Sequence, residues 1–351
     1  MIRLWSDDLD GAHADLGAAL RRAVRGEPLR IGQLLGFLGE AEYRRGELVA
    51  AATHTELAVG DAEENNRVWD YAMLHGLACY PLAAQAEWDA AGAHAEQATA
   101  WARMTGTPAA VTYAAAARAA LGQARGVPAE LLAAADDLDA HYPIREPGTY
   151  VVGAVRAEGL ALLGDVAGAE KALAEFAGRI TGPPRRSAVM ALARGGSLLA
   201  AARGRHAEAL DEARRGRSHA AGIGMPLEAA RFDLLIADAE GALGRRAAAE
   251  RHLRVALSAF ATTGARAYTA QTLAAAERLG VPLGAPPAAL DGLTAAERAV
   301  ASLVCQGLSN RDIAARLVIS VKTVEFHLTR VFRRLDVANR AQLRRVLAEH
   351  G

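Results

Sequence analysis

A glycine recurs between apolar stretches through the first 265 residues, and this pattern constrains the fold more than any other feature. The glycines follow one another at intervals of 34 to 46 residues: Gly46, Gly92, Gly126, Gly164, Gly204 and Gly244. Because glycine readily ends a helix in the left-handed conformation, each position predicts the turn of an αα-hairpin. A single hairpin cannot bury its apolar face, so successive hairpins are expected to stack into an array.

A small residue stands three positions after each glycine, and it is alanine in five of the six cases. We expect these alanines to let the second helix of each pair approach the first closely. The composition, 52% hydrophobic but only 5% aromatic, also favours helix. The sequence therefore predicts an all-α chain in which residues 1–279 form a helical-repeat array. The array resembles tetratricopeptide-type repeats without their full aromatic and proline framework; a plain helical bundle is the alternative.

Prolines and glycines interrupt the helical pattern between Gly280 and Gly292, so we expect a linker at residues 280–290. A second domain should then occupy residues 291–351. This domain contains ten Arg or Lys against six Asp or Glu, whereas the residues before it are net acidic. A basic domain attached to an acidic one indicates a polyanion as the partner of the basic domain.

Helix signals divide the second domain into four predicted helices. Two capping boxes mark the starts of the first and second: Thr294 with Glu297, and Ser309 with Asp312. Ser320 is expected to cap a third helix that ends near Leu335, and a fourth follows over residues 341–350.

The predicted third helix has two different faces. Its core stripe is apolar: Val321, Val324, Leu328, Val331 and Leu335. The opposite side is cationic and polar with one phenyl ring: Lys322, Phe326, Thr329, Arg330 and Arg333. Such cations can bind phosphates or a guanine edge, and a phenyl ring can contact a thymine methyl. The N-terminus from Ser320 to Thr323 also offers N–H groups to a phosphate, so this helix fits the major groove of DNA.

The stretch LTAAERAVASLVCQGLSNRDIAARLVISVKTVEFHLTRVFRRLDVANRAQL resembles the LuxR-type helix-turn-helix. The resemblance implies a four-helix DNA-binding domain whose third helix enters the major groove and whose fourth helps to form a homodimer. Carried over by position, it implies phosphate contacts at Ser309, Asn310 and Arg311. The complete set of expected DNA contacts is Ser309, Asn310, Arg311, Ser320, Val321, Lys322, Thr323, Phe326, His327, Thr329, Arg330 and Arg333.

Two of these positions leave alternatives open. His327 borders the core stripe, and a packing histidine fits there as well as a phosphate contact does. Glu325 stands where the family often has lysine, so no base preference is carried over from relatives.

Residues 29–58 resemble part of the large ATP-binding LuxR regulators of actinobacteria, which carry a nucleotide-binding domain before their repeats. A P-loop requires GxxxxGK[ST], and neither Lys171 nor Lys322 has that context. ATP-dependent switching is therefore not expected within these residues. We expect either a short standalone regulator or further sequence upstream.

Other classes of site find little support. Cys79 and Cys305 form no CxxC motif, which fits a reducing cytoplasm. The histidines have no HxxH or HxxxH spacing, so no metal site is expected, and no catalytic constellation, cofactor motif, secretion signal or membrane span is expected either. Four aromatic residues could line a ligand groove, although core packing is the favoured reading: Trp69, Tyr71, Trp88 and Trp101.

These observations predict a cytoplasmic transcriptional regulator. Its repeats would sense a protein or small-molecule effector, and its C-terminal domain would bind double-stranded promoter DNA as a homodimer. The alternative is an interaction adaptor that works mainly through the concave surface of its repeats, with DNA binding secondary.

Overall fold

The computed structural model describes residues 2–26, 30–141, 154–180, 185–283, 293, 295–305, 307–317 and 321–349. The regular structure of these residues is helical throughout, which confirms the all-α prediction. The described helices are α1 (Ile2–Trp5), α2 (Leu9–Gly26), α3 (Ile31–Arg44), α4 (Leu48–Glu64), α5 (Tyr71–Ala84), α6 (Trp88–Thr105), α7 (Pro108–Arg125), α8 (Pro128–His141), α9 (Val155–Leu162), α10 (Val166–Gly178), α11 (Arg186–Ala202), α12 (His206–Gly222), α13 (Pro226–Ala242), α14 (Arg246–Thr263), α15 (Arg266–Arg278), α16 (Ala295–Cys305), α17 (Asn310–Leu317), α18 (Val321–Arg334) and α19 (Arg340–Glu349).

Five of the six predicted hairpin glycines do form turns between helices. Their φ angles lie between 70° and 82°: Gly46, Gly126, Gly164, Gly204 and Gly244. The prediction for Gly92 is wrong, because Gly92 lies inside α6. The turn before α6 is made instead by Ala86, a non-glycine residue at φ 59°. A glycine-based search cannot find such a turn.

The alanines at the helix contacts are not the predicted ones. Four alanines three positions after a turn glycine are exposed: Ala129, Ala167, Ala207 and Ala247. The residues five positions after the turn glycines are at most 2% exposed: Ala51, Leu131, Ala169, Ala209 and Ala249. Two residues turn a helix by about 200°, so these two positions lie on opposite faces. The fourth residue of each of these second helices is therefore a buried, core-facing position.

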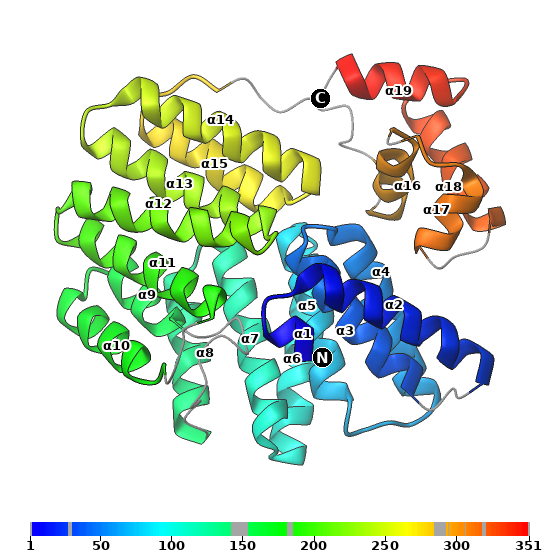
Figure 1. Cartoon of the computed structure of the whole chain (residues 1–351), viewed down its shortest axis with the longest axis horizontal. Coiled ribbons are helices and arrows are strands. Elements are labelled where there is room, and N and C mark those ends of the chain that lie inside the picture. Colours follow the sequence, from blue (N-terminus) through cyan, green and yellow to red (C-terminus); the bar gives the residue numbers. More distant parts are fainter. Residues whose placement is uncertain are drawn as a thin grey trace.

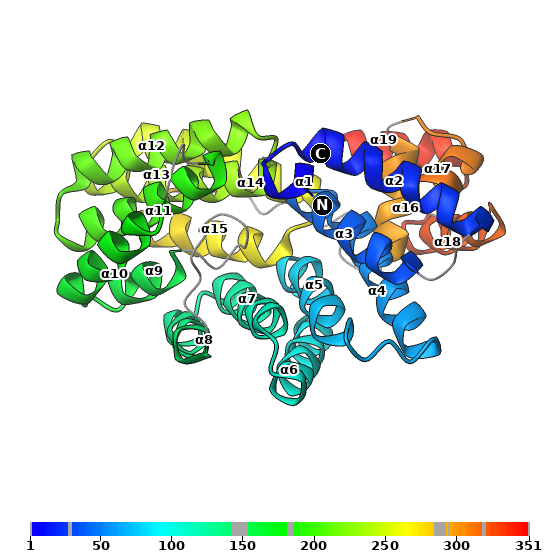
Figure 2. The ribbon, with the colours of Figure 1, turned by 60° about the horizontal axis from the view of Figure 1, so that its bottom comes forward.

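The array folds back on itself instead of remaining an open solenoid (Figures 1 and 2). Helix α15 packs against α5, α7 and α13. The Arg266 guanidinium donates to Glu87 at 2.6 Å, and the Gln271 amide donates to the backbone carbonyls of Gln123 and Ala124 at 2.8 Å. Residues far apart in the sequence thus share one core, and α15 lies between the middle and the late hairpins.

Helices α16 to α19 form a separate small core beside the N-terminal hairpins (Figure 1). This core also includes Ala50 of α4, with Val49 packed against it, and α16 and α17 both contact α4. Arg316 of α17 forms an ion pair with Glu47 at 3.5 Å. We call the α4 surface formed by Glu47, Val49 and Ala50 the seat.

Most of the predicted linker lies outside the described residues. Its first part is visible: Gly280 has φ 63°, and the side chain of Val281 is buried against α14 and α15. Among the described helices, none is both long and apolar enough to cross a lipid bilayer.

Candidate nucleic-acid interface

The apolar stripe of α18 holds this helix on α16 and α17. Val324, Leu328 and Val331 are at most 5% exposed, as predicted. Val321, the first residue of α18, is 41% exposed instead of buried, because the helix begins there at its open end. Val321 is therefore on the surface, where DNA can reach it. The buried residues in the middle of α18 hold the helix on the core.

The predicted capping box of α17 is confirmed. The Asp312 N–H donates to the Ser309 hydroxyl at 3.2 Å, and the Ser309 hydroxyl and N–H donate to the Asp312 carboxylate at 2.6 and 3.2 Å. These hydrogen bonds from Ser309 lower the pKa of the Asp312 carboxyl. The Ser309 hydroxyl thus caps the N-terminus of α17. The sequence predicts that this end of the helix faces a DNA phosphate.

Asn310 and Arg311 have different surroundings at the start of α17. The Asn310 side-chain oxygen accepts a hydrogen bond from Arg340 of α19, which also donates to the carbonyl of Leu308. Asn310 therefore ties α17 to α19, which the sequence did not indicate. Arg311 is exposed and remains available for a phosphate contact.

The outer face of α18 is exposed, as the helical wheel predicts. Lys322, Thr329 and Arg333 are exposed, and the Phe326 ring is 56% exposed. The Thr329 hydroxyl donates to the carbonyl of Glu325 at 2.9 Å, so its proton is used within the helix. Thr323 is half-buried, and Ser320 lies outside the described residues.

Arg330 lies over this face instead of extending from it. Its guanidinium carbon is 5.1 Å from the centre of the Phe326 ring, and its Nε is 3.7 Å from a Glu297 oxygen. The cation therefore stacks on the exposed ring and is held from behind by a carboxylate. Phe326 and Arg330 are thus in contact with each other on the proposed reading surface.

Glu297 is a site residue whose role sequence reasoning missed. It was expected to close a capping box with Thr294, which lies outside the described residues. Its carboxylate is fully buried and accepts from Arg334 of α18 at 2.9 Å. A buried carboxylate in a charged hydrogen bond fixes α18 on α16. Only the packing of α16 on α18 reveals this pairing.

His327 is half-buried beside Phe326, with 5.7 Å between the ring centres. Burial lowers the pKa of His327, which favours the neutral imidazole. Its Nδ1 is buried and has no hydrogen-bond partner among the described residues. A neutral imidazole carries no charge to offset that of a phosphate. Of the two alternatives for His327, packing is therefore favoured over a phosphate contact.

The C-terminal part of the chain is similar in sequence to known proteins. Residues 291–347 match the family described as bacterial regulatory proteins, luxR family. Residues 291–347 are a luxR-family DNA-binding domain. The chain is also 42% identical over 88 residues to a Mycobacterium bovis protein whose name describes an HTH-type transcriptional regulator. It is 39% identical over 79 residues to a response regulator of Synechocystis, and 45% identical over 51 residues to the tetrathionate response regulatory protein of Salmonella typhimurium.

These matches cover limited parts of both partners. The mycobacterial match spans 25% of this chain and 10% of that protein, and the Synechocystis match spans 21% and 34%. The Salmonella match spans 14% of this chain and 25% of that protein. The resemblance of the array to the large ATP-binding regulators therefore stays a prediction.

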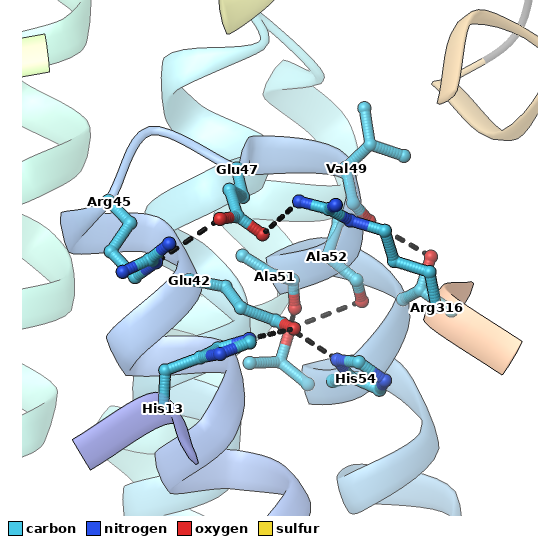
Figure 3. A network of polar contacts seen from close by, with 11 residues as sticks. His13, Glu42, Arg45, Glu47, Val49, Ala51, Ala52, His54 and Arg316 are labelled. Carbon is cyan, nitrogen blue, oxygen red and sulfur yellow. Dashed lines mark hydrogen bonds and ion pairs between the residues drawn. The ribbon is translucent and has the colours of Figure 1, made fainter. Parts of the chain in front are cut away.

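The luxR-family domain meets the array at a polar network around the seat (Figure 3). Arg316 reaches from α17 across α4 to one side of the Glu47 carboxylate, and Arg45 donates to its other side at 3.1 Å. Below them, buried Glu42 accepts from His54 at 2.7 Å and lies 3.6 Å from His13. The hydrogen bond with Glu42 raises the pKa of His13.

Part of this network has the composition of a metal site. Donor atoms of His13, Glu42 and Glu47 lie within 4.8 Å of one another, although the three residues show no metal-binding spacing in the sequence. Glu47, however, is already neutralised by the guanidiniums of Arg45 and Arg316. These cations oppose a bound metal ion, so the cluster is better described as an ion-pair network.

Ala50→Arg is expected to separate the luxR-family domain from the array, because it places a charge in the apolar contact at the seat. The radius of gyration by small-angle scattering should rise, and amide hydrogen exchange in α16 should become faster. Glu63→Arg, at an exposed position on the same helix, should change neither quantity. An unchanged radius of gyration in Ala50→Arg would show that the seat does not hold the two parts together.

Proposed function

We propose that the chain is a sequence-specific transcriptional regulator whose helix α18 enters the major groove of promoter DNA. The observation that carries this proposal is the exposed face of α18, where Lys322 and Arg333 flank the stacked pair of Phe326 and Arg330. Lys and Arg can contact phosphate or guanine, while the ring can contact a thymine methyl. We place this activity in the cytoplasm, where a bacterial promoter would be accessible.

Two copies of the chain are proposed to bind one operator. A single small DNA-binding domain buries only about 600–1,000 Å², which is little for a specific site. A homodimer on a two-fold operator doubles the contacts and matches the usual symmetry of such regulators. The repeats are proposed to receive the signal, since they contact the luxR-family domain directly through the seat.

Lys322→Ala and Arg333→Ala are the variants that test this proposal. Promoter fragments are first identified by genome-wide mapping of bound DNA, and their affinity is then measured by fluorescence anisotropy at several salt concentrations. Each variant should weaken specific binding by about 1–3 kcal/mol if it contacts a base, or reduce the salt slope by about one if it contacts a phosphate.

Arg205→Ala supplies the matched control, because it removes an exposed arginine from the array. Its DNA affinity and salt slope should equal those of the wild type. If Lys322→Ala and Arg333→Ala also left binding unchanged, α18 would not be the reading helix. If the wild type showed only weak, sequence-independent binding, the adaptor alternative would be favoured.

A further inference from the structure

Two side chains in the middle of the exposed face of α18 are in contact with each other. Phe326 and Arg330 stand four residues apart, so they are neighbours on the same side of the helix. The guanidinium carbon of Arg330 is 5.1 Å from the centre of the Phe326 ring, and the ring is 56% exposed. The two side chains therefore present an apolar surface and a cation next to each other to solvent.

The buried carboxylate of Glu297 lies behind Arg330 and determines which edge of its guanidinium faces outward. The Arg330 nitrogen nearest to this carboxylate is Nε, at 3.7 Å. The two Nη groups lie at the far end of the guanidinium and donate to no described residue. Because Nε faces the core, the edge that carries both Nη groups faces away from it. This edge is the fork that matches the O6 and N7 acceptors of guanine.

The position of the pair along α18 favours base edges over phosphates. Lys322 and Arg333 are exposed at the two ends of the same face, about 16 Å apart at the helical rise of about 1.5 Å per residue. The major groove is about 12 Å wide, so side chains at these two ends can reach the phosphates along its walls. Phe326 and Arg330 lie between them, where the floor of the groove presents base edges.

We propose that Phe326 and Arg330 together read a thymine and a guanine in neighbouring base pairs of the operator. The Nη groups of Arg330 donate to O6 and N7 of the guanine, and the Phe326 ring packs on the methyl group of the thymine. The bases are neighbours because the two side chains touch, and because next-but-one base pairs are about 6.8 Å apart, farther than the 5.1 Å between guanidinium and ring. This inference rests on the proposed function, because it assigns the bases that α18 reads.

The test begins with the full chain and a pool of random duplex DNA, from which bound sequences are selected and sequenced. The wild type should select a half-site that contains a thymine next to a guanine. Replacing that guanine by 7-deazaguanine, which lacks the N7 acceptor, should weaken binding about fivefold or more. Replacing that thymine by deoxyuridine, which lacks the methyl group, should weaken binding about fourfold.

Arg330→Gln identifies the base that Arg330 contacts. Glutamine matches the edge of adenine, so this variant should lower the preference for guanine over adenine by about 5- to 150-fold at one position. Preferences at positions beyond the neighbouring base pair should stay unchanged. Buried Glu297 keeps its hydrogen bond with Arg334 in this variant, so the domain should remain folded.

Phe326→Ala identifies the neighbouring base. Without the ring, thymine and deoxyuridine should bind equally well at the position next to the guanine. The Phe326 side chain is largely exposed, so its removal should leave the unfolding midpoint of the domain close to that of the wild type. Arg345→Ala, at an exposed position of α19, is the matched control and should leave both base preferences unchanged.

Two results would overturn the assignment. If Arg330→Gln weakened binding to all sequences equally and reduced the salt slope by about one, Arg330 would contact a phosphate. If the positions altered by Arg330→Gln and Phe326→Ala were not adjacent, the two side chains would not read one base step.

These outcomes are separable from the proposed function. A wild type that selects no sequence from the pool would contradict the sequence-specific regulator itself. A wild type that selects a defined operator, with base preferences that neither variant changes, would contradict only the reading by Phe326 and Arg330.

Discussion

Glu228→Ala is expected to lower the free energy of unfolding of the repeat array by roughly 3–5 kcal/mol, the usual effect of removing one partner from a buried ion pair. Glu228 is buried between Arg194 and Arg231, which are themselves buried. Without the carboxylate, two buried guanidiniums remain, and among the described residues Glu158 is the one other carboxylate paired with Arg231, at 3.9 Å. Urea unfolding followed by circular dichroism measures this loss.

Glu212→Ala provides the matched control for this variant. Glu212 pairs with Arg215 on the surface of α12, where an ion pair contributes less than about 1 kcal/mol. Its unfolding midpoint should stay close to that of the wild type. A loss in Glu228→Ala no larger than in the control would mean that the buried network is not a structural centre of the array.

The same carboxylate predicts how stability depends on pH. Although burial alone would raise the pKa of Glu228, the charges of Arg231 and Arg194 outweigh it and lower the pKa to about 2 from its ordinary 4.5. A lowered pKa gives stability that is fully present above 4.5 and is lost as the pH falls towards 2. The contribution is about 3 kcal/mol, an order of magnitude obtained from the size of the pKa change.

Glu228→Gln tests this pH dependence, because glutamine retains the shape but cannot titrate. Between pH 4.5 and pH 2 the wild type should lose more stability than Glu228→Gln does. Parallel losses in the two proteins would show that other carboxylates govern acid unfolding.

Leu328→Ala is expected to destabilise the luxR-family domain by about 2–5 kcal/mol and to abolish specific DNA binding at physiological temperature. Leu328 lies in the centre of α18 and is 5% exposed within the core shared by α16, α17 and α19. A domain of about 60 residues has a total stability of only about 3–9 kcal/mol, so this loss is a large fraction of it.

Amide hydrogen exchange separates this effect from a lost DNA contact. Protection in α16 to α18 should fall, while protection in α11 to α14 stays unchanged, because the two groups of helices belong to different cores. Arg345→Ala, at an exposed position in α19, should alter neither protection nor DNA affinity. Full protection of α16 in Leu328→Ala would contradict the assigned core.

Much of the local structure could be predicted from the sequence alone. The turn glycines, the apolar stripe and the exposed face of α18, and the capping box of α17 all follow from short-range spacing. Helix ends and amphipathic faces depend on residues within one or two turns, and such patterns are directly readable. The luxR-family domain was recognisable for the same reason, since its motif lies within about sixty residues.

The positive φ of Ala86 and the buried alanines at the fourth residue of the second helices were missed. A turn of this kind carries no distinctive residue, and the register of a helix pair depends on how two helices meet. The sequence also did not show which of the four aromatic residues Trp69, Tyr71, Trp88 and Trp101 are packed and which are exposed. Tyr71 and Trp101 pack edge to face with 4.7 Å between their centres, whereas Trp69 is 74% exposed.

The sequence by itself determined that the chain forms helix pairs ending in a basic helix-turn-helix with one face suited to DNA. Only the tertiary structure decided which distant side chains meet: Glu297 with Arg334, Glu47 with Arg316, and Glu228 with Arg194. Each pair joins residues on different helices, separated by between 34 and 269 positions. Their meeting depends on how the array folds back and where the DNA-binding domain packs, which follows from burying the apolar faces together and not from any local pattern.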